Sequence, residues 1–63
     1  MEEKISNYEY NRAIVISIIH LMDTGQPITF KNISTLSEIP EYTLKNDFEN
    51  VYRIAKLLDD YVE

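Results

Sequence analysis

The fold of this chain is decided by residues 28–48, ITFKNISTLSEIPEYTLKNDF, whose apolar residues are spaced as two short helices around a tight turn. Thr29 is a good N-cap residue, and a helix that follows it would turn Ile33 toward the core. Pro40 lacks a backbone N–H and suits the first turn of a second helix, which would bury Leu44. Two short helices joined by a turn of about three or four residues predict a helix-turn-helix unit.

A first helix is predicted upstream, from about Tyr8 to Met22, after a polar lead-in and with Asn7 as its cap. Its middle, residues 13–19, is dense in β-branched residues, which on propensity alone would also suit a buried strand. A helix is favoured because the apolar run continues to Met22 and no second strand-like run exists to pair with it.

This first helix would be apolar around most of its circumference. At about 100° per residue its polar stripe is narrow, with Ser17 and His20 and with Arg12 nearby. A helix of this kind is normally covered on more than one side. Its cover is either the rest of the domain or a second subunit, which would also use Val15 or Ile16.

The sequence also predicts where the first helix ends and that the last segment of the chain is helical. Gly25, the one glycine of the chain, can supply a left-handed cap, and Pro27 prevents the first helix from continuing. The last segment, Phe48 to Glu63, carries apolar residues at steps of three and four, which predicts an amphipathic helix with Asn50 on its polar side.

The chain of 63 residues is expected to form one domain, residues 1–63, with residues 1–7 frayed. The predicted fold is all-α, a compact bundle of three or four helices that contains the helix-turn-helix. The predicted core residues of that unit are Ile33, Leu36, Ile39, Leu44 and Phe48.

The small size of the chain favours a homodimer. A chain of about this length buries only about 60% of the surface that its unfolded form exposes, so its own core is marginal. A second copy would add buried apolar area without adding chain. The predicted dimer contact is on the last helix, at Ile54, Leu57, Leu58 and Tyr61.

Composition argues against several classes of function. The chain has no cysteine and a single imidazole, His20, so we expect neither a metal site nor a catalytic site, and no cofactor. The longest apolar-rich segment, residues 13–22, has about half the length needed to span a bilayer. We therefore expect a cytoplasmic protein that is not an enzyme and has no membrane partner.

One known pattern matches residues 28–48 at several points. The matching positions are Ile28-Thr29, Ile33-Ser34, Ser37-Glu38-Ile39-Pro40, Thr43-Leu44-Lys45 and Phe48. With them the chain resembles, from about Tyr8 to Leu58, the amino-terminal DNA-binding domain of the TetR-like transcriptional regulators. The resemblance implies that the second helix of the unit lies in a DNA groove.

The departures from the family concern charge. The glycine of the family's turn is Glu38 here, its phosphate-contacting aromatic residue is Lys45, and a basic residue after the turn is Glu41. The family also has a lysine three residues after the phenylalanine, where this chain has Val51. Between Glu38 and Asn50 four acids face one base, and the whole chain carries a net charge of −5 with only six basic residues. This charge disfavours binding to phosphates.

Two functions therefore stay open. One is a transcriptional regulator that binds DNA weakly as a dimer. The other is an acidic helix-turn-helix module that binds a basic or nucleic-acid-binding protein, a reading supported by five tyrosines, which are enriched at protein interfaces. For both functions the predicted binding residues are Thr29, Lys31, Glu41, Tyr42, Thr43, Lys45 and Asn46.

Overall fold

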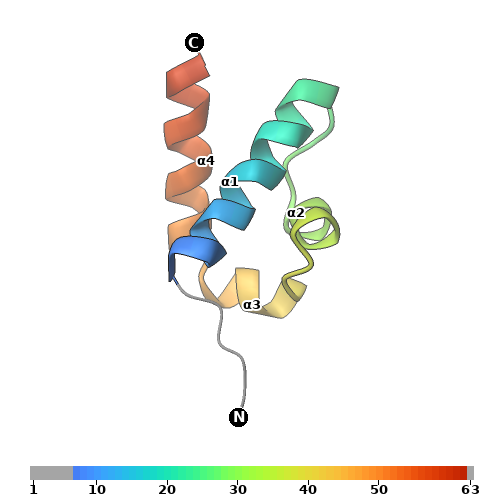
Figure 1. The fold of residues 1–63 in the computed structure, drawn as a ribbon, viewed down its shortest axis with the longest axis vertical. Helices are drawn as coiled ribbons and strands as arrows, with labels where there is room; N and C mark the ends of the chain where they lie inside the picture. Colours follow the sequence, from blue (N-terminus) through green and yellow to red (C-terminus); the bar gives the residue numbers. More distant parts are fainter. Residues whose placement is uncertain (1–6, 63) are drawn as a thin grey trace.

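The computed structural model describes residues 7–62, with only the backbone described at Tyr61 and Val62. It contains four helices, α1 (Asn7–Thr24), α2 (Phe30–Ser37), α3 (Glu41–Asn46) and α4 (Phe48–Val62), and no strand within these residues (Figure 1). The predicted all-α fold is confirmed, and residues 13–19 are helical. Of the predicted frayed residues 1–7, residues 1–6 lie outside what is described, whereas Asn7 is helical. The predicted dimer contact of the Tyr61 side chain also lies outside what is described.

Helix α1 is the centre of the bundle. In Figure 1, α2 and α4 lie on opposite sides of α1, and α3 joins them at one end. Both α2 and α4 pack on α1, yet they have no Cα atoms within 8 Å of each other. The buried apolar side chains come from all four helices and the α2–α3 connection: Ile14, Ile18, Leu21, Ile33, Ile39, Leu44 and Val51.

Two of the five predicted core residues of the 28–48 segment are not buried. Ile33, Ile39 and Leu44 are confirmed, but Leu36 is 42% exposed and Phe48 is 53% exposed. Helix α2 packs on α1 through Ile33, and Leu36 lies at the rim of a shallow hollow that Ile16 of α1 also lines. Phe48 is the first residue of α4, and Val51 takes the buried position one turn later.

The predicted polar stripe of α1 is also wrong at Ser17, which is only 2% exposed. Ser17 is three residues after Ile14 and four before Leu21, so it shares their face of the helix. Its hydroxyl donates a hydrogen bond of 2.8 Å to the carbonyl of Ala13, which satisfies it inside the core. Ile16, by contrast, is about half exposed.

The end of α1 follows from the glycine. Gly25 has a φ of 71°, in the left-handed region, as predicted for a cap. The amide of Gln26 donates to the carbonyl of Leu21 (2.9 Å), and the amide of Gly25 donates to that of Met22 (3.3 Å). These two bonds form a Schellman cap and end the helix at Thr24, two residues later than predicted.

The starts of α1 and α3 also differ from the prediction. Asn7, predicted as a cap that precedes the helix, is itself helical and is the first residue of α1 that the structure describes. Pro40 occupies the N-cap position of α3, with a φ of −55° and a ψ of 141°, and the helix begins one residue later. Among residues 7–62, no helix has both the length and the apolar character needed to cross a membrane.

Candidate functional site

Helix α3 presents one polar face to the outside. Leu44 is fully buried and is the one buried residue of this helix. Tyr42 and Asn46 lie about 160° around the helix from Leu44, and Lys45 lies about 100° from it. Tyr42 is accordingly 71% exposed, and Lys45 and Asn46 are exposed as well. A helix of six residues with a single buried anchor thus carries three outward side chains that can bind a partner.

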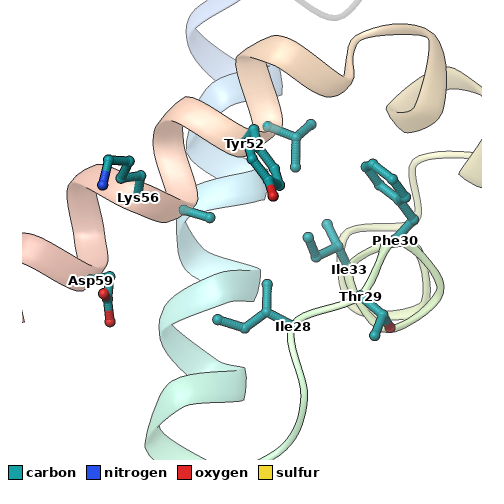
Figure 2. A pocket seen from close by; sticks show the side chains of 9 residues that line it. Ile28, Thr29, Phe30, Ile33, Tyr52, Lys56 and Asp59 are labelled. Carbon is teal, nitrogen blue, oxygen red and sulfur yellow. The ribbon is translucent and has the colours of Figure 1, made fainter.

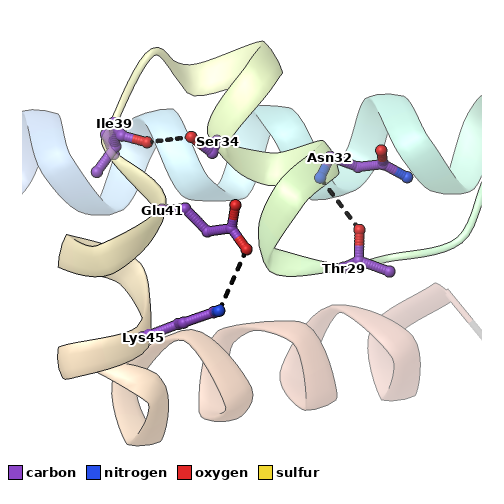
Figure 3. Close-up of polar contacts among 6 residues, drawn as sticks. All are labelled: Thr29, Asn32, Ser34, Ile39, Glu41 and Lys45. Carbon is purple, nitrogen blue, oxygen red and sulfur yellow. Dashed lines mark hydrogen bonds and ion pairs between the residues drawn. The ribbon is translucent and has the colours of Figure 1, made fainter.

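The connection between α2 and α3 is held by side chains of α2. The Ser34 hydroxyl donates a hydrogen bond of 2.6 Å to the carbonyl of Ile39, as Figure 3 shows. The Ser37 hydroxyl accepts one of 3.2 Å from the amide of Ile39. Ile39 itself is only 4% exposed. Both backbone groups of this buried turn residue are therefore satisfied, and the direction in which α3 leaves the turn is fixed.

The turn contains a strained residue. Glu38 has a φ of 66° and a ψ of 18°, in the left-handed region that favours glycine. Its amide donates a bond of 2.8 Å to the carbonyl of Ser34, which ends α2. Glu38 adopts this backbone shape at a conformational cost, because a Cβ atom is disfavoured in the left-handed region.

Thr29 and Thr43 have roles in the fold besides any role in binding. The Thr29 hydroxyl accepts a bond of 3.1 Å from the amide of Asn32, so the predicted N-cap is confirmed (Figure 3). The amide of Thr43 donates to the carbonyl of Pro40 (3.0 Å) in the first turn of α3, and its side chain is half-buried. Lys31, in the first turn of α2, is exposed.

Glu41 and Lys45 form an ion pair. Their Oε2 and Nζ atoms lie 3.4 Å apart, four residues apart on α3 (Figure 3). Both side chains are well exposed, at 43% and 60%. An exposed pair of this kind contributes only about 0.2–1 kcal/mol, so Lys45 can exchange Glu41 for another anion at little cost. Glu41 nonetheless neutralises the one cation of α3 when no partner is bound.

The corner where α3 meets α4 is tied to α1. The Asn50 amide donates to Asn11 Oδ1 of α1 (2.9 Å) and to Asp47 Oδ2 (3.0 Å), and its own oxygen accepts from Arg53 Nη2 (2.8 Å). Asn50 was predicted to be on the outer side of the last helix, but it is half-buried because Asn11 lies opposite. Asp47 ends α3, so this network holds the end of α3 against α1.

Tyr10 lies beside the same corner. Its hydroxyl is buried, and it forms no hydrogen bond with any group among the described residues. Burial, and then the neighbouring Asp47 carboxylate, raise the pKa of Tyr10 to about 12. Tyr10 therefore stays uncharged at neutral pH, and its ring packs against the core.

An apolar groove separates the start of α2 from α4, and Figure 2 shows its lining. The groove has a volume of about 730 Å³. Ile33 and Val51 belong to the buried core at its base, whereas Tyr52 is 75% exposed. Lys56 and Asp59 contribute the charged part of its lining. The groove exists because α2 and α4 both pack on α1 while their own Cα atoms stay more than 8 Å apart.

The predicted dimer contact is only partly available. Ile54 and Leu58 are half-buried and pack against the core of their own chain. Leu57 is 60% exposed. Among these three residues, Leu57 has the largest free apolar surface.

The seven predicted binding residues lie in two places, at the start of α2 and along α3. Among these seven, the structure brings Glu41 and Lys45 together as an ion pair. Within residues 7–62, no three acidic or histidine side chains come together where they could hold a metal ion. No protein-family model, curated protein or solved structure matches this chain.

Proposed function

We propose that this chain is a small TetR-like helix-turn-helix protein that regulates transcription by binding DNA weakly, as a dimer, through α3. The observation that carries the proposal is the one-sided packing of α3. Leu44 anchors the helix, while Tyr42 and Lys45 are directed outward, and Ser34 and Ser37 fix the turn before it. A short helix held rigidly by a turn and exposing polar side chains is what a DNA groove requires.

The charge of the chain limits the strength of this binding. Phosphate contacts by Lys and Arg supply most of the non-specific affinity for DNA, and this chain has six basic residues against eleven acidic ones. On α3 the candidate phosphate contact is Lys45, which must first leave Glu41. Because that exposed pair is weak, the exchange lowers the affinity without preventing binding.

A protein partner is the second candidate, and the same ion pair favours it. With Lys45 neutralised by Glu41, the most prominent feature of the α3 surface is the aromatic ring of Tyr42, which is 71% exposed. Exposed tyrosine and low positive charge are typical of protein interfaces rather than of DNA interfaces. A basic protein would bind this surface through the acidic residues around it.

The variant Glu41→Lys separates the two candidates. It removes a carboxylate, releases Lys45 and adds a second cation on α3, so we expect the affinity for duplex DNA to rise about tenfold at about 50 mM salt. Fluorescence anisotropy with a labelled duplex measures this change. The matched control is Asp23→Lys, which makes the same change of charge in the last turn of α1, an end of the molecule remote from α3 (Figure 1).

The control should change the affinity for DNA much less than Glu41→Lys does. A synthetic peptide rich in lysine and arginine serves as the second probe. If the physiological partner is a basic protein, Glu41→Lys should bind this peptide more weakly than the wild type does. In that case neither the wild type nor Glu41→Lys should bind DNA. Absence of DNA binding by both the wild type and Glu41→Lys at low salt would contradict the DNA proposal.

A further inference from the structure

We propose that one flank of α4 binds the same flank of a second copy of this chain, with the two α4 helices antiparallel about a two-fold axis at Leu57. The flank consists of Arg53, Leu57 and Asp60, and we call it the Leu57 flank. The inference rests on the dimeric state in the proposed function, and it requires nothing of DNA.

The side chains of the Leu57 flank are exposed among the described residues, and Arg53 Nη2 donates one hydrogen bond of 2.8 Å to Asn50 Oδ1 of the same helix. Leu57 is 60% exposed, and Arg53 and Asp60 are exposed as well. The groove beside α2 takes up a different side of α4, through Tyr52 and Lys56. Lys56 and Leu57 lie about 100° apart around the helix. Among the residues whose side chains are described, a large apolar side chain is therefore presented to solvent on a flank that the groove does not use.

The charges around Leu57 are arranged with opposite signs. Arg53 is four residues before Leu57 and about 40° from it around the helix, and Asp60 is three residues after it and about 60° from it. Along the helix axis these positions lie about 6 Å before and about 4.5 Å after Leu57. The flank therefore carries a positive charge on one side of its apolar centre and a negative charge on the other.

This arrangement is complementary to itself. When two copies meet antiparallel at Leu57, Arg53 lies opposite the partner's Asp60, and the two-fold axis repeats this pair at the other end. A parallel arrangement would instead place Arg53 beside the partner's Arg53. A uniformly basic partner would meet repulsion from Arg53. The charges thus select a second copy, in the antiparallel orientation.

The expected dimer is weak. A stable interface buries about 800 Å² on each partner. Helix α4 has fifteen residues and is about 22 Å long, and only one flank of it takes part. We expect a dimer that forms and dissociates with concentration in the micromolar range, with its affinity dependent on salt because both ion pairs lie at the rim.

Charge reversal tests the arrangement with the full chain. Arg53→Glu places like charges opposite the partner's Asp60, and Asp60→Lys places like charges opposite the partner's Arg53, so each variant alone should dimerise about tenfold more weakly or worse. An equimolar mixture of the two variants restores both attractive pairs, and it should form a heterodimer about as strong as the wild-type dimer. Analytical ultracentrifugation measures the masses and the dissociation constants.

Two controls separate this contact from general effects of charge and hydrophobicity. Lys56→Glu makes a similar change of charge on the groove side of α4 and should leave the dimer intact. Leu57→Ser should abolish the dimer, whereas Tyr52→Ser, which truncates an even more exposed apolar side chain, should not. A wild type that stays monomeric at high micromolar concentration, or a mixture of the two charge variants that fails to associate, would overturn the proposal. A wild-type protein that forms this dimer but does not bind DNA would contradict only the proposed function.

Discussion

Leu44→Ala is expected to remove a large part of the free energy of unfolding and to lower the melting temperature strongly. Leu44 is fully buried and is the one side chain through which α3 enters the core. Truncating a buried leucine to alanine costs about 2–5 kcal/mol, because apolar contacts are lost and a cavity remains. A domain of this size has a stability of only about 3–9 kcal/mol, so this one change removes much of it. Urea and thermal unfolding followed by circular dichroism give the loss directly.

The matched control is Leu36→Ala, the same chemical change at a residue that is 42% exposed. We expect it to cost less than about 1 kcal/mol, because a side chain with this exposure gains little from burial and leaves no closed cavity. Equal losses for the two variants would mean that α2 and α3 contribute different residues to the core than the structure shows.

Glu38→Gly is expected to stabilise the protein by about 1 kcal/mol. Glu38 has a φ of 66°, and the left-handed conformation costs a residue with a Cβ about 1–2 kcal/mol, of which part is offset by the greater freedom of glycine in the unfolded chain. For a domain of this size, a gain of 1 kcal/mol raises the melting temperature by about 4–8 °C. Thermal unfolding of the wild type and of Glu38→Gly measures the difference in melting temperature.

Charge must be separated from backbone shape in this comparison. Glu38→Ala removes the same carboxylate but keeps a Cβ, so it should not give the gain that glycine gives. A melting temperature for Glu38→Ala as high as that of Glu38→Gly would attribute the effect to charge and would contradict the assignment of strain at this turn.

The two ends of the connection between α1 and α2 could be predicted from sequence because each depends on one residue. Gly25 ends α1 in the left-handed conformation, and Thr29 caps α2 with its hydroxyl. Packing depth could not be predicted in the same way. The spacing of Leu36 suits a buried face, but Ile33 is the buried residue of α2, while Leu36 remains 42% exposed at the rim of a hollow. The polarity of Ser17 predicts an exposed side chain, but its position on the same face of α1 as Ile14 buries it.

The candidate site was predictable in part. The spacing of Glu41 and Lys45 by four residues on a helix is enough to predict their ion pair. The hydrogen bonds of Ser34 and Ser37 to Ile39 depend on the exact path of the turn, which no spacing rule gives. The groove between α2 and α4 depends on the angle at which each crosses α1, and this too has no signal in the sequence.

Burial also adds to the case for weak DNA binding. The proposed TetR-like resemblance implies a lysine at the position of Val51, and Val51 is 4% exposed in the core. A valine buried there contributes to folding and supplies no contact to phosphate. The loss of that cation leaves Lys45 on α3 and Lys31 on α2 as exposed cations among the predicted binding residues.

The most direct test of DNA binding through α3 is the salt dependence of the affinity of wild type and Lys45→Ala for the same duplex. Each phosphate contact adds about 0.9 to the slope of log affinity against log salt concentration. We expect measurable binding by the wild type at about 50 mM salt, and for Lys45→Ala a weaker affinity for every sequence with a slope smaller by about one per subunit. Identical slopes for the two proteins, or no binding by the wild type at low salt, would contradict DNA binding through α3.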